Sequence, residues 1–214
     1  MILKLIIIAV VSYLLGNISS GILVAKAFGA GDIRKQGSGN SGTTNVLRTL
    51  GWLPSALTLL GDCLKGLIAC LLGRWFSGDL GMLLAGLCVT LGHDFPVFFG
   101  FKGGKGIATS LGMILVISPA LALSLLAVVL IVVAITGLMS LGSVMVSVAY
   151  PILTAIIFRG HENYHLFVIF SIICGLLSLY CHRANIMRLI RHEENRLDFK
   201  KISRLSSKLG GKKK

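Results

Sequence analysis

Long apolar stretches alternate with short polar stretches along the chain. The apolar stretches cover roughly residues 2–28, 52–76, 80–101, 106–158 and 164–181. The polar stretches cover residues 29–50, residues 102–105 and the chain from His182 onward. Each apolar stretch approaches or exceeds the about 20 residues that a helix needs to cross a bilayer. The pattern therefore predicts an all-α, polytopic membrane protein.

The fourth apolar stretch is too long for one crossing. From Gly106 to Phe158 the chain has no Asp, Glu, Lys, Arg or His. At about 1.5 Å per residue this is roughly 80 Å of helix, against a hydrocarbon core of about 30 Å. Breaks near Ser118-Pro119 and Gly137–Gly142 would divide it into three spans of about 17 residues. Pro151 would kink the last of these spans rather than end it.

Composition excludes other classes of protein. Of 214 residues, 55% are hydrophobic and 14% are charged, and a soluble domain of this length could not bury so much apolar surface. The net charge of +13 does not indicate nucleic-acid binding, because the aromatic residues lie in apolar runs and not among the bases. The five cysteines lie in or beside apolar segments without metal-ligand spacing. We therefore expect no metal and no cofactor.

The positive charges predict an orientation. Lys and Arg residues number four in 26–50, two in 102–105 and 11 from Arg183 onward, together 17 of the 21 in the chain. The positive-inside rule places these three stretches in the cytoplasm. An apolar run that continues to about Phe28 favours a retained first span over a cleaved signal peptide. With three crossings by residues 106–158, the prediction is seven transmembrane helices, with the N-terminus outside and the C-terminus cytoplasmic.

The sequence predicts one large domain followed by a short extension. Residues 1–199 are expected to form a single integral membrane domain, because no internal repeat or linker interrupts them. Residues 200–214 are expected to form a basic, flexible cytoplasmic extension. Two interpretations of the extension stay open. Its bases could bind the anionic lipid surface, at about 1 kcal/mol for each base close to the membrane, or it could be a solvated tail without function.

The first polar stretch has the composition of an anion-binding loop. Residues 37–45 are three glycines, two asparagines, two serines and two threonines. Glycines let successive backbone N–H groups converge on an anion, while hydroxyl and amide side chains add hydrogen bonds. Arg48 follows at the start of the next helical stretch and can hold a phosphate with its planar guanidinium. A flexible linker would not need this order of donors, so we favour a phosphate site.

The second polar stretch ends in Gly103-Gly104-Lys105-Gly106, ahead of an apolar helix. This is half of a nucleotide-binding loop. The full P-loop needs an earlier glycine, for which Gly100 stands one residue too late, and a Ser or Thr where Gly106 stands. There is thus no ATP site, but glycines and a Lys at a helix N-terminus still favour a phosphate. His93 and Asp94 could be acid–base groups, although we favour a structural role at the membrane interface.

Two later motifs add hydroxyl and imidazole groups. Ser140-Leu141-Gly142-Ser143 lies where we expect an inward turn, but serines in membrane helices usually bond to their own backbone. His182 and Asn185 are three residues apart on a helix that leaves the membrane, so they share a face. His182 could act as a base or donate to a phosphate, and the neighbouring Asn and basic residues favour function over a merely solvated histidine.

Asp62 and Lys65 stand three residues apart inside the second apolar stretch. Opposite charges at membrane depth tend to pair, so we favour an ion pair that supports the site over a direct catalytic role. Together, the polar clusters supply cations and N–H donors but no Ser-His-Asp triad and no paired carboxylates. Such a site would stabilise a developing oxyanion more readily than it would generate a protein nucleophile.

Four ordered motifs resemble those of one family. They are Ser-Gly-Asn-x-Gly-x-Thr-Asn-x-x-Arg (38–48), Gly-His-x-Phe-Pro-Val-Phe with Gly-Phe-Lys-Gly-Gly-Lys-Gly (92–106), Ser-Leu-Gly-Ser (140–143) and His-Arg-x-Asn-Ile (182–186). Over about residues 5–197 the chain resembles the bacterial acyl-phosphate:glycerol-3-phosphate acyltransferases, PlsY. The resemblance implies a seven-helix enzyme of the bacterial inner membrane whose active site faces the cytoplasm.

The implied reaction transfers a fatty acyl group from acyl phosphate, not from acyl-CoA or acyl carrier protein, to the 1-hydroxyl of glycerol 3-phosphate. The products are 1-acyl-glycerol 3-phosphate and inorganic phosphate, in the first step of phospholipid synthesis. Either His182 or the donor's phosphate could take the hydroxyl proton. The implied partners are these two substrates and membrane lipids, and the soluble enzyme that makes acyl phosphate is a further candidate.

Matched position by position, the resemblance implies two sets of site residues. The catalytic set is Ser38, Arg48, Lys105, Ser143, His182 and Asn185. The substrate-binding set is Gly39, Asn40, Gly42, Thr44, Asn45, Gly103, Gly104 and Arg183. The chain departs from the family pattern at Ser41, Thr43 and His192, and it lacks a proline in residues 17–20. None of these departures falls on the catalytic set.

Two other classes of protein share some of these features. A transporter of phosphorylated or other anions would also carry intramembrane charges and glycine-broken helices. Its polar groups should lie at the membrane midplane, however, and an inverted repeat should be visible, whereas the polar motifs here lie at one face. A metal-dependent phosphoalcohol transferase would need clustered aspartates, and the eight acidic residues are scattered.

The distribution of bases makes a prediction about sidedness. Single cysteines introduced at Gln36, Lys102 and Lys201 should react with an impermeant thiol reagent from the cytoplasmic side, and one at Asn163 from the outside. Opposite labelling of the Gln36 and Lys201 positions would contradict seven crossings.

Overall fold

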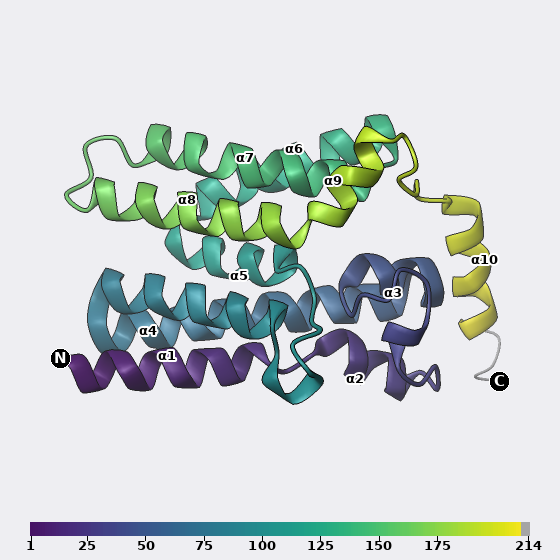
Figure 1. Ribbon diagram of the computed structural model, residues 1–214, viewed down its shortest axis with the longest axis horizontal. Coiled ribbons are helices and arrows are strands. Elements are labelled where there is room, and N and C mark those ends of the chain that lie inside the picture. Colours follow the sequence, from purple (N-terminus) through teal and green to yellow (C-terminus); the bar gives the residue numbers. More distant parts are fainter. Residues whose placement is uncertain (211–214) are drawn as a thin grey trace.

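The structure, a computed structural model, describes residues 1–210, and every regular element among them is a helix (Figure 1). The first half contains α1 (Ile2–Gly16), α2 (Ser20–Ala27), η1 (Ile33–Lys35), α3 (Thr43–Leu50), α4 (Trp52–Asp94) and η2 (Val97–Phe99). The second half contains α5 (Ile107–Ile117), α6 (Pro119–Thr136), α7 (Met139–Ile157), α8 (Tyr164–Cys181), α9 (Arg183–Ile190) and α10 (Phe199–Gly210). The predicted all-α class is confirmed.

Five helical segments of the described chain are long and apolar enough to cross a membrane. They are Ile2–Ala27, Trp52–Phe99, Pro119–Thr136, Met139–Ile157 and Tyr164–Cys181. Many large apolar side chains on these segments are exposed, for example Ile7, Leu60 and Ile131, as expected of faces that meet lipid. The apolar sequence pattern thus corresponds to a bundle that is apolar outside as well as inside.

Helix α4 is a hairpin of two helices. Its backbone leaves helical geometry at Ser77 and Gly78, and Gly78 has a φ of 60°, which favours glycine. Gly73 and Gly81 lie on either side of this turn. A Cβ on either one would overlap with the backbone carbonyl of the other. The two halves therefore pack side by side, and the predicted break between residues 76 and 80 is confirmed.

The charge-free stretch is broken twice. Ser118 ends α5, and its hydroxyl accepts a hydrogen bond from the Leu121 amide at 3.3 Å to cap α6, where Pro119 is the first residue. Gly137 ends α6 with a φ of 71°. The expectation of a turn at residues 140–143 is wrong, because Gly137 and Leu138 make the turn and the two serines lie in the first turns of α7.

Small residues let the helices approach closely. A Cβ on Gly66 would overlap with the backbone of Thr109, and one on Gly112 would overlap with that of Cys63, so α4 and α5 are in backbone contact. Gly16 of α1 meets the α4 backbone at Val89 in the same way. In a membrane such contacts supply the packing that lipid cannot.

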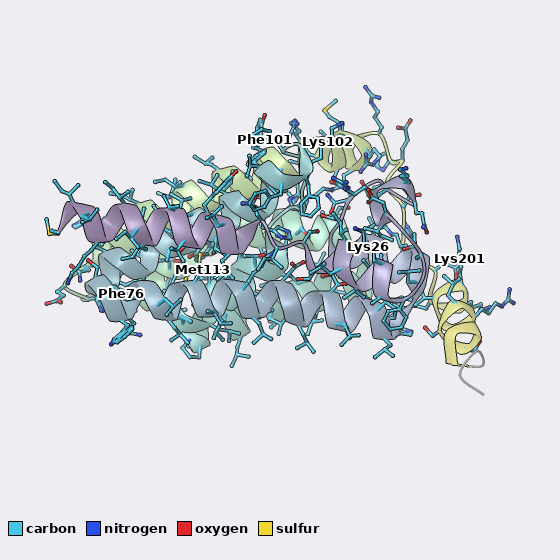
Figure 2. The ribbon with its side chains drawn as sticks, turned by 90° about the horizontal axis from the view of Figure 1, so that it is seen from below. Lys26, Phe76, Phe101, Lys102, Met113 and Lys201 are labelled. Atoms are coloured by element: carbon cyan, nitrogen blue, oxygen red, sulfur yellow. The ribbon has the colours of Figure 1, made fainter. Side chains whose placement is uncertain are left out.

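Basic residues from distant parts of the chain gather toward one end of the bundle. Figure 2 shows Lys26, Lys102 and Lys201 toward this end and Phe76 near the opposite end. At the opposite end the turn of the α4 hairpin lies beside the turn between α7 and α8, because Asn163 donates a hydrogen bond to Asp79 at 3.1 Å. Arg74 and Arg159 are the bases near these two turns. A second cavity, of about 560 Å³, lies between residues 117–119 and residues 157–161 at this opposite end.

The basic segment after residue 198 forms a helix where the sequence predicts a flexible extension. Phe199, Ile202 and Leu205 recur every three residues and give α10 an apolar face. Ile202 is only 2% exposed, and α10 packs across α3 and the start of α4. Residues 211–214 of the predicted extension lie outside the described residues. The division into a domain of residues 1–199 and an extension stays a prediction.

Candidate active site

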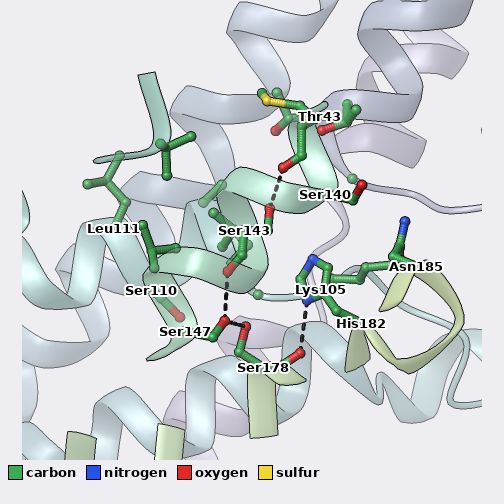
Figure 3. Close-up of a pocket in the computed structure, with 18 of the residues that line it drawn as sticks. Thr43, Lys105, Ser110, Leu111, Ser140, Ser143, Ser147, Ser178, His182 and Asn185 are labelled. Carbon is green, nitrogen blue, oxygen red and sulfur yellow. Dashed lines mark hydrogen bonds between the residues drawn. The ribbon is translucent and has the colours of Figure 1, made fainter. Parts of the chain in front are cut away.

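One cavity of about 450 Å³ is lined by residues of every helix from α3 to α9 (Figure 3). All six catalytic candidates line its polar part: Ser38, Arg48, Lys105, Ser143, His182 and Asn185. Apolar side chains line its other part: Leu111, Ile114, Leu125, Val146, Tyr150 and Cys174. The cavity thus joins a cationic compartment to an apolar one, and it can accept a molecule with a charged head and an apolar chain.

The loop of residues 37–45 is shaped by Asn45. The side-chain oxygen of this buried residue accepts a hydrogen bond from the Ser38 amide at 2.8 Å. Its side-chain nitrogen donates to the carbonyls of Ile33, Gln36 and Asn40 at 3.2, 3.0 and 2.8 Å. Asn45 lines the cavity, but its amide is already used, so it holds the loop in shape. This arrangement places Ser38 at the cavity.

The second loop is held against the first and against α4. The Asn40 side chain donates to the Gly103 carbonyl at 3.2 Å, which joins the two loops. The amides of Gly103 and Gly104 donate to the carbonyls of Asp94 and His93 at 3.2 and 3.0 Å. A Cβ on Gly104 would overlap with the His93 imidazole, so only glycine fits there. The loop delivers Lys105 to the cavity at the start of α5.

A buried carboxylate orders the groups on α9. Asn185 and Arg188 donate to the same Glu194 oxygen at 3.1 and 3.0 Å, and the Glu194 side chain is 2% exposed. Since a carboxylate only accepts, the Asn185 amide turns its oxygen the other way, where the Lys105 ammonium donates to it. Glu194 thereby fixes the orientation of Asn185 and ties it to Lys105.

The cations of the cavity are only partly neutralised. Arg48 donates to the Asn195 carbonyl at 2.7 Å, but its buried Nε has no partner among the described residues. Burial lowers the pKa of Arg48. Burial, followed by the charge of Arg188, lowers the pKa of Lys105. Arg48, Lys105 and Arg188 are three cations near one carboxylate, that of Glu194. An anion bound here would lower the repulsion between the cations and would accept hydrogen bonds from their free N–H groups.

His182 is a neutral group in this setting. It is 3% exposed, and burial lowers its pKa to about 4. Its Nδ1 lies 2.9 Å from the Ser178 carbonyl, which can only accept, so Nδ1 carries the proton (Figure 3). Nε2 is then an acceptor. His182 can receive a hydrogen bond from a hydroxyl group, but it is a weak base.

Serine hydroxyls continue along the cavity from the polar part toward the apolar part. Ser143 donates to the Met139 carbonyl at 3.0 Å, as expected for a serine in a membrane helix. Ser147 lies 2.8 Å from the Ser143 carbonyl and 2.7 Å from the Ser178 hydroxyl (Figure 3). The oxygen of Ser143 keeps its lone pairs for a further donor.

The predicted substrate-binding residues divide into two groups. Asn40, Gly42, Thr44 and Asn45 line the cavity. Gly39, Gly103, Gly104 and Arg183 do not. The three glycines belong to the loops that carry Ser38 and Lys105. Arg183 stacks 4.3 Å above the Tyr180 ring and donates to the Tyr180 carbonyl, away from the cavity, because it lies on another face of α9.

Sequence reasoning did not assign Arg188 or Glu194 to the site, although both line the cavity. Arg188 follows His182 and Asn185 in steps of three, so helical spacing could have preferred it to Arg183. Glu194 follows the end of α9, where no periodicity applies. Only the turn through His192, with a φ of 56°, returns it to the site.

Comparisons with known proteins agree on one family. The family model described as glycerol-3-phosphate acyltransferase matches residues 6–192. A glycerol-3-phosphate acyltransferase of Clostridioides difficile (strain 630) is 47% identical over 92% of this chain and 97% of its own length. One of Thermoanaerobacter pseudethanolicus is 42% identical over 88% of this chain and 93% of its own length.

Solved structures agree with the sequence comparisons. The crystal structure of PlsY (YgiH), an integral membrane glycerol 3-phosphate acyltransferase, in its glycerol 3-phosphate form has a TM-score of 0.82 and 36% identity. The match covers 91% of this chain and 96% of that one. The lysophosphatidic acid form of the same protein has a TM-score of 0.81 and 35% identity, over 92% of this chain and 97% of that one.

The buried, neutral His182 predicts a pH dependence of stability. Its pKa of about 4 lies below the ordinary 6.5, so the unfolded chain binds the extra proton between these values. The contribution of His182 to the free energy of unfolding should be fully present above about pH 6.5. It should fall by on the order of 3 kcal/mol as the pH drops toward 4. Thermal unfolding in detergent at pH 7 and pH 5 should show a smaller loss for His182→Asn than for the wild type. Equal losses would contradict the assignment.

Proposed function

This chain belongs to the glycerol-3-phosphate acyltransferase family, and from that membership we propose how its cavity transfers an acyl group to glycerol 3-phosphate. The protein is an integral membrane O-acyltransferase. The proposed donor is acyl phosphate. The observation that carries this choice is the division of the cavity, because acyl phosphate is an apolar chain that ends in a phosphate. The cationic part can hold the phosphates of both substrates, and the apolar part can hold the acyl chain.

In the proposed reaction the C1 hydroxyl oxygen of glycerol 3-phosphate attacks the acyl carbonyl carbon. The bond from that carbon to the phosphate oxygen breaks, and an ester and inorganic phosphate form. Negative charge develops on the carbonyl oxygen and then on the leaving phosphate. In this proposal Lys105, Arg48 and the backbone N–H groups at the start of α3 stabilise this charge, and no protein nucleophile is needed.

The hydroxyl proton goes to the leaving phosphate in this proposal. The released inorganic phosphate is comparable to a phosphate monoester, whose second pKa is about 6, whereas the pKa of His182 is lowered to about 4, chiefly by burial. The phosphate is therefore the stronger base. His182 Nε2 accepts a hydrogen bond from the attacking hydroxyl and orients it, and Ser143 lines the same cavity.

The proposed topology has seven crossings, with the N-terminus outside and the C-terminus in the cytoplasm. Support comes from the α4 hairpin, from the breaks on either side of α6 and from the excess of bases at the opposite end, because Arg74 and Arg159 are the bases near the turns at Gly78 and Gly160. Helix α5 has 11 residues and makes the short crossing, with its loop entering from the basic end. The site then faces the cytoplasm of a bacterial inner membrane, where both phosphorylated substrates are made.

The proposed grip on phosphate predicts the effect of two substitutions. Arg48→Ala or Lys105→Ala removes a charge-assisted interaction and should cost about 1.5–3 kcal/mol, or one to two decades in kcat/KM. Arg48→Lys should recover little, because an ammonium group lacks the planar fork, whereas Lys105→Arg should keep part of the activity. Steady-state kinetics with each substrate varied would measure this.

The exposed Lys102, in the same loop as Lys105, is the matched control, and Lys102→Ala should keep kcat/KM near the wild-type value. A loss confined to the KM for glycerol 3-phosphate would assign the residue to that substrate, and a loss in kcat would assign it to the reacting acyl phosphate. If both alanine variants insert, fold and react at the wild-type rate, the phosphate-binding proposal is wrong.

A further inference from the structure

Lys65 is a buried ammonium group that takes no part in the proposed reaction. It is 4% exposed in the middle of the first half of α4. Three acceptors surround its nitrogen: Asp62 Oδ1 at 2.8 Å, His93 Nδ1 at 2.8 Å and the Ile18 carbonyl at 2.7 Å. An ammonium group has three hydrogens, so each can have an acceptor. The predicted Asp62–Lys65 pair is confirmed, and the pair extends to two further segments of the chain.

The ammonium group determines the form of His93. Because Lys65 can only donate, His93 Nδ1 must be unprotonated, and the neutral ring then carries its proton on Nε2. The ring is 6% exposed, and its Nδ1 is 3.6 Å from Asp62 Oδ1, too far for a hydrogen bond. Lys65 therefore stands between the carboxylate and the imidazole and sets the orientation of both.

His93 passes this orientation to the Gly103–Lys105 loop. The His93 carbonyl accepts the Gly104 amide at 3.0 Å, and the Nε2 edge of the ring lies against the Gly104 backbone, where a Cβ would overlap with it. Gly104 directly precedes Lys105. A rotation of the His93 ring would therefore push on the loop at the residue before the cation of the site.

The bond from Lys65 to Ile18 reaches the other loop. Ile18 lies in the break between α1 and α2, and its carbonyl receives the Lys65 ammonium. Helix α2 then packs on the first loop so closely that a Cβ on Gly21 would overlap with the Ser41 carbonyl. One ammonium group thus connects to both phosphate loops, which meet at the Asn40 to Gly103 hydrogen bond.

We propose that Lys65 is a positioning residue for the transfer reaction: held by Asp62, it sets the register of the Ser38 and Lys105 loops through Ile18 and His93. The proposal rests on the proposed role of Lys105. Positioning is a different role from stabilising the fold. A buried ion pair can often be replaced by apolar residues without loss of stability. Stability and positioning can therefore be separated by experiment.

The test compares a single with a double substitution. Lys65→Met leaves the Asp62 carboxylate buried without its partner, so the unfolding temperature in detergent should fall. The double variant Asp62→Leu/Lys65→Met removes both charges and should regain most of that temperature. Its kcat/KM should nevertheless stay at least about tenfold below the wild type, because the loops lose their common anchor. The loss should fall on the same kinetic parameter as in Lys105→Ala.

Two further variants keep the result interpretable. His93→Asn retains an acceptor for Lys65 and removes the ring edge that supports Gly104, so it should fold well and show the same kinetic loss. Asn163→Ala breaks the hydrogen bond to Asp79 at the opposite end and should keep wild-type kinetics. Wild-type kinetics in the double variant, or in a folded His93→Asn protein, would overturn the positioning role. Wild-type kinetics in Lys105→Ala would instead overturn the proposed function itself.

Discussion

The buried cations of this bundle need hydrogen-bond acceptors, and few carboxylates lie close enough to serve them. The arrangement of the loops and helices around the cavity follows from this shortage. Lys105 donates to the oxygen of an amide, Arg48 to the carbonyl of Asn195 and Lys65 partly to that of Ile18. Of the nearby carboxylates, Asp62 pairs with Lys65, whereas Glu194 accepts hydrogen bonds from Asn185 and Arg188 and from neither Lys105 nor Arg48. A phosphate that enters the cavity supplies the charge that the protein leaves short. In the proposed function, recognition of the phosphorylated substrates follows from the way these cations are buried.

Much of the architecture could be predicted from local patterns. Apolar length located the spans, and Gly78, Ser118 and Gly137 marked breaks that need a left-handed residue or a cap. The six residues matched through the family motifs line one cavity, and the Asp62–Lys65 pair follows from the cost of an unpaired charge at membrane depth. These features depend on composition and on spacing within one segment, so the sequence contains them.

The remaining features depend on contacts between segments. Nothing local indicates that Glu194 returns to Asn185, or that His93 lies between Lys65 and Gly104. Arg183 and Arg188 are equally basic, and the face of α9 that meets the cavity decides between them. The α10 helix was missed because Lys200, Lys201 and Arg204 dominate its composition, whereas the apolar step of three that buries Ile202 is short.

In the proposed function, a cationic pocket joined to an apolar one uses acyl phosphate as its donor, without help from a metal ion. The direct measurement is the formation of 1-acyl-glycerol 3-phosphate by purified protein from glycerol 3-phosphate, with acyl phosphate or acyl-CoA as the donor, with and without EDTA. If Arg48, Lys105 and backbone donors meet the developing charge as proposed, EDTA should not reduce turnover with acyl phosphate, and acyl-CoA should give no turnover. Turnover that prefers acyl-CoA, or that strictly requires magnesium, would contradict it.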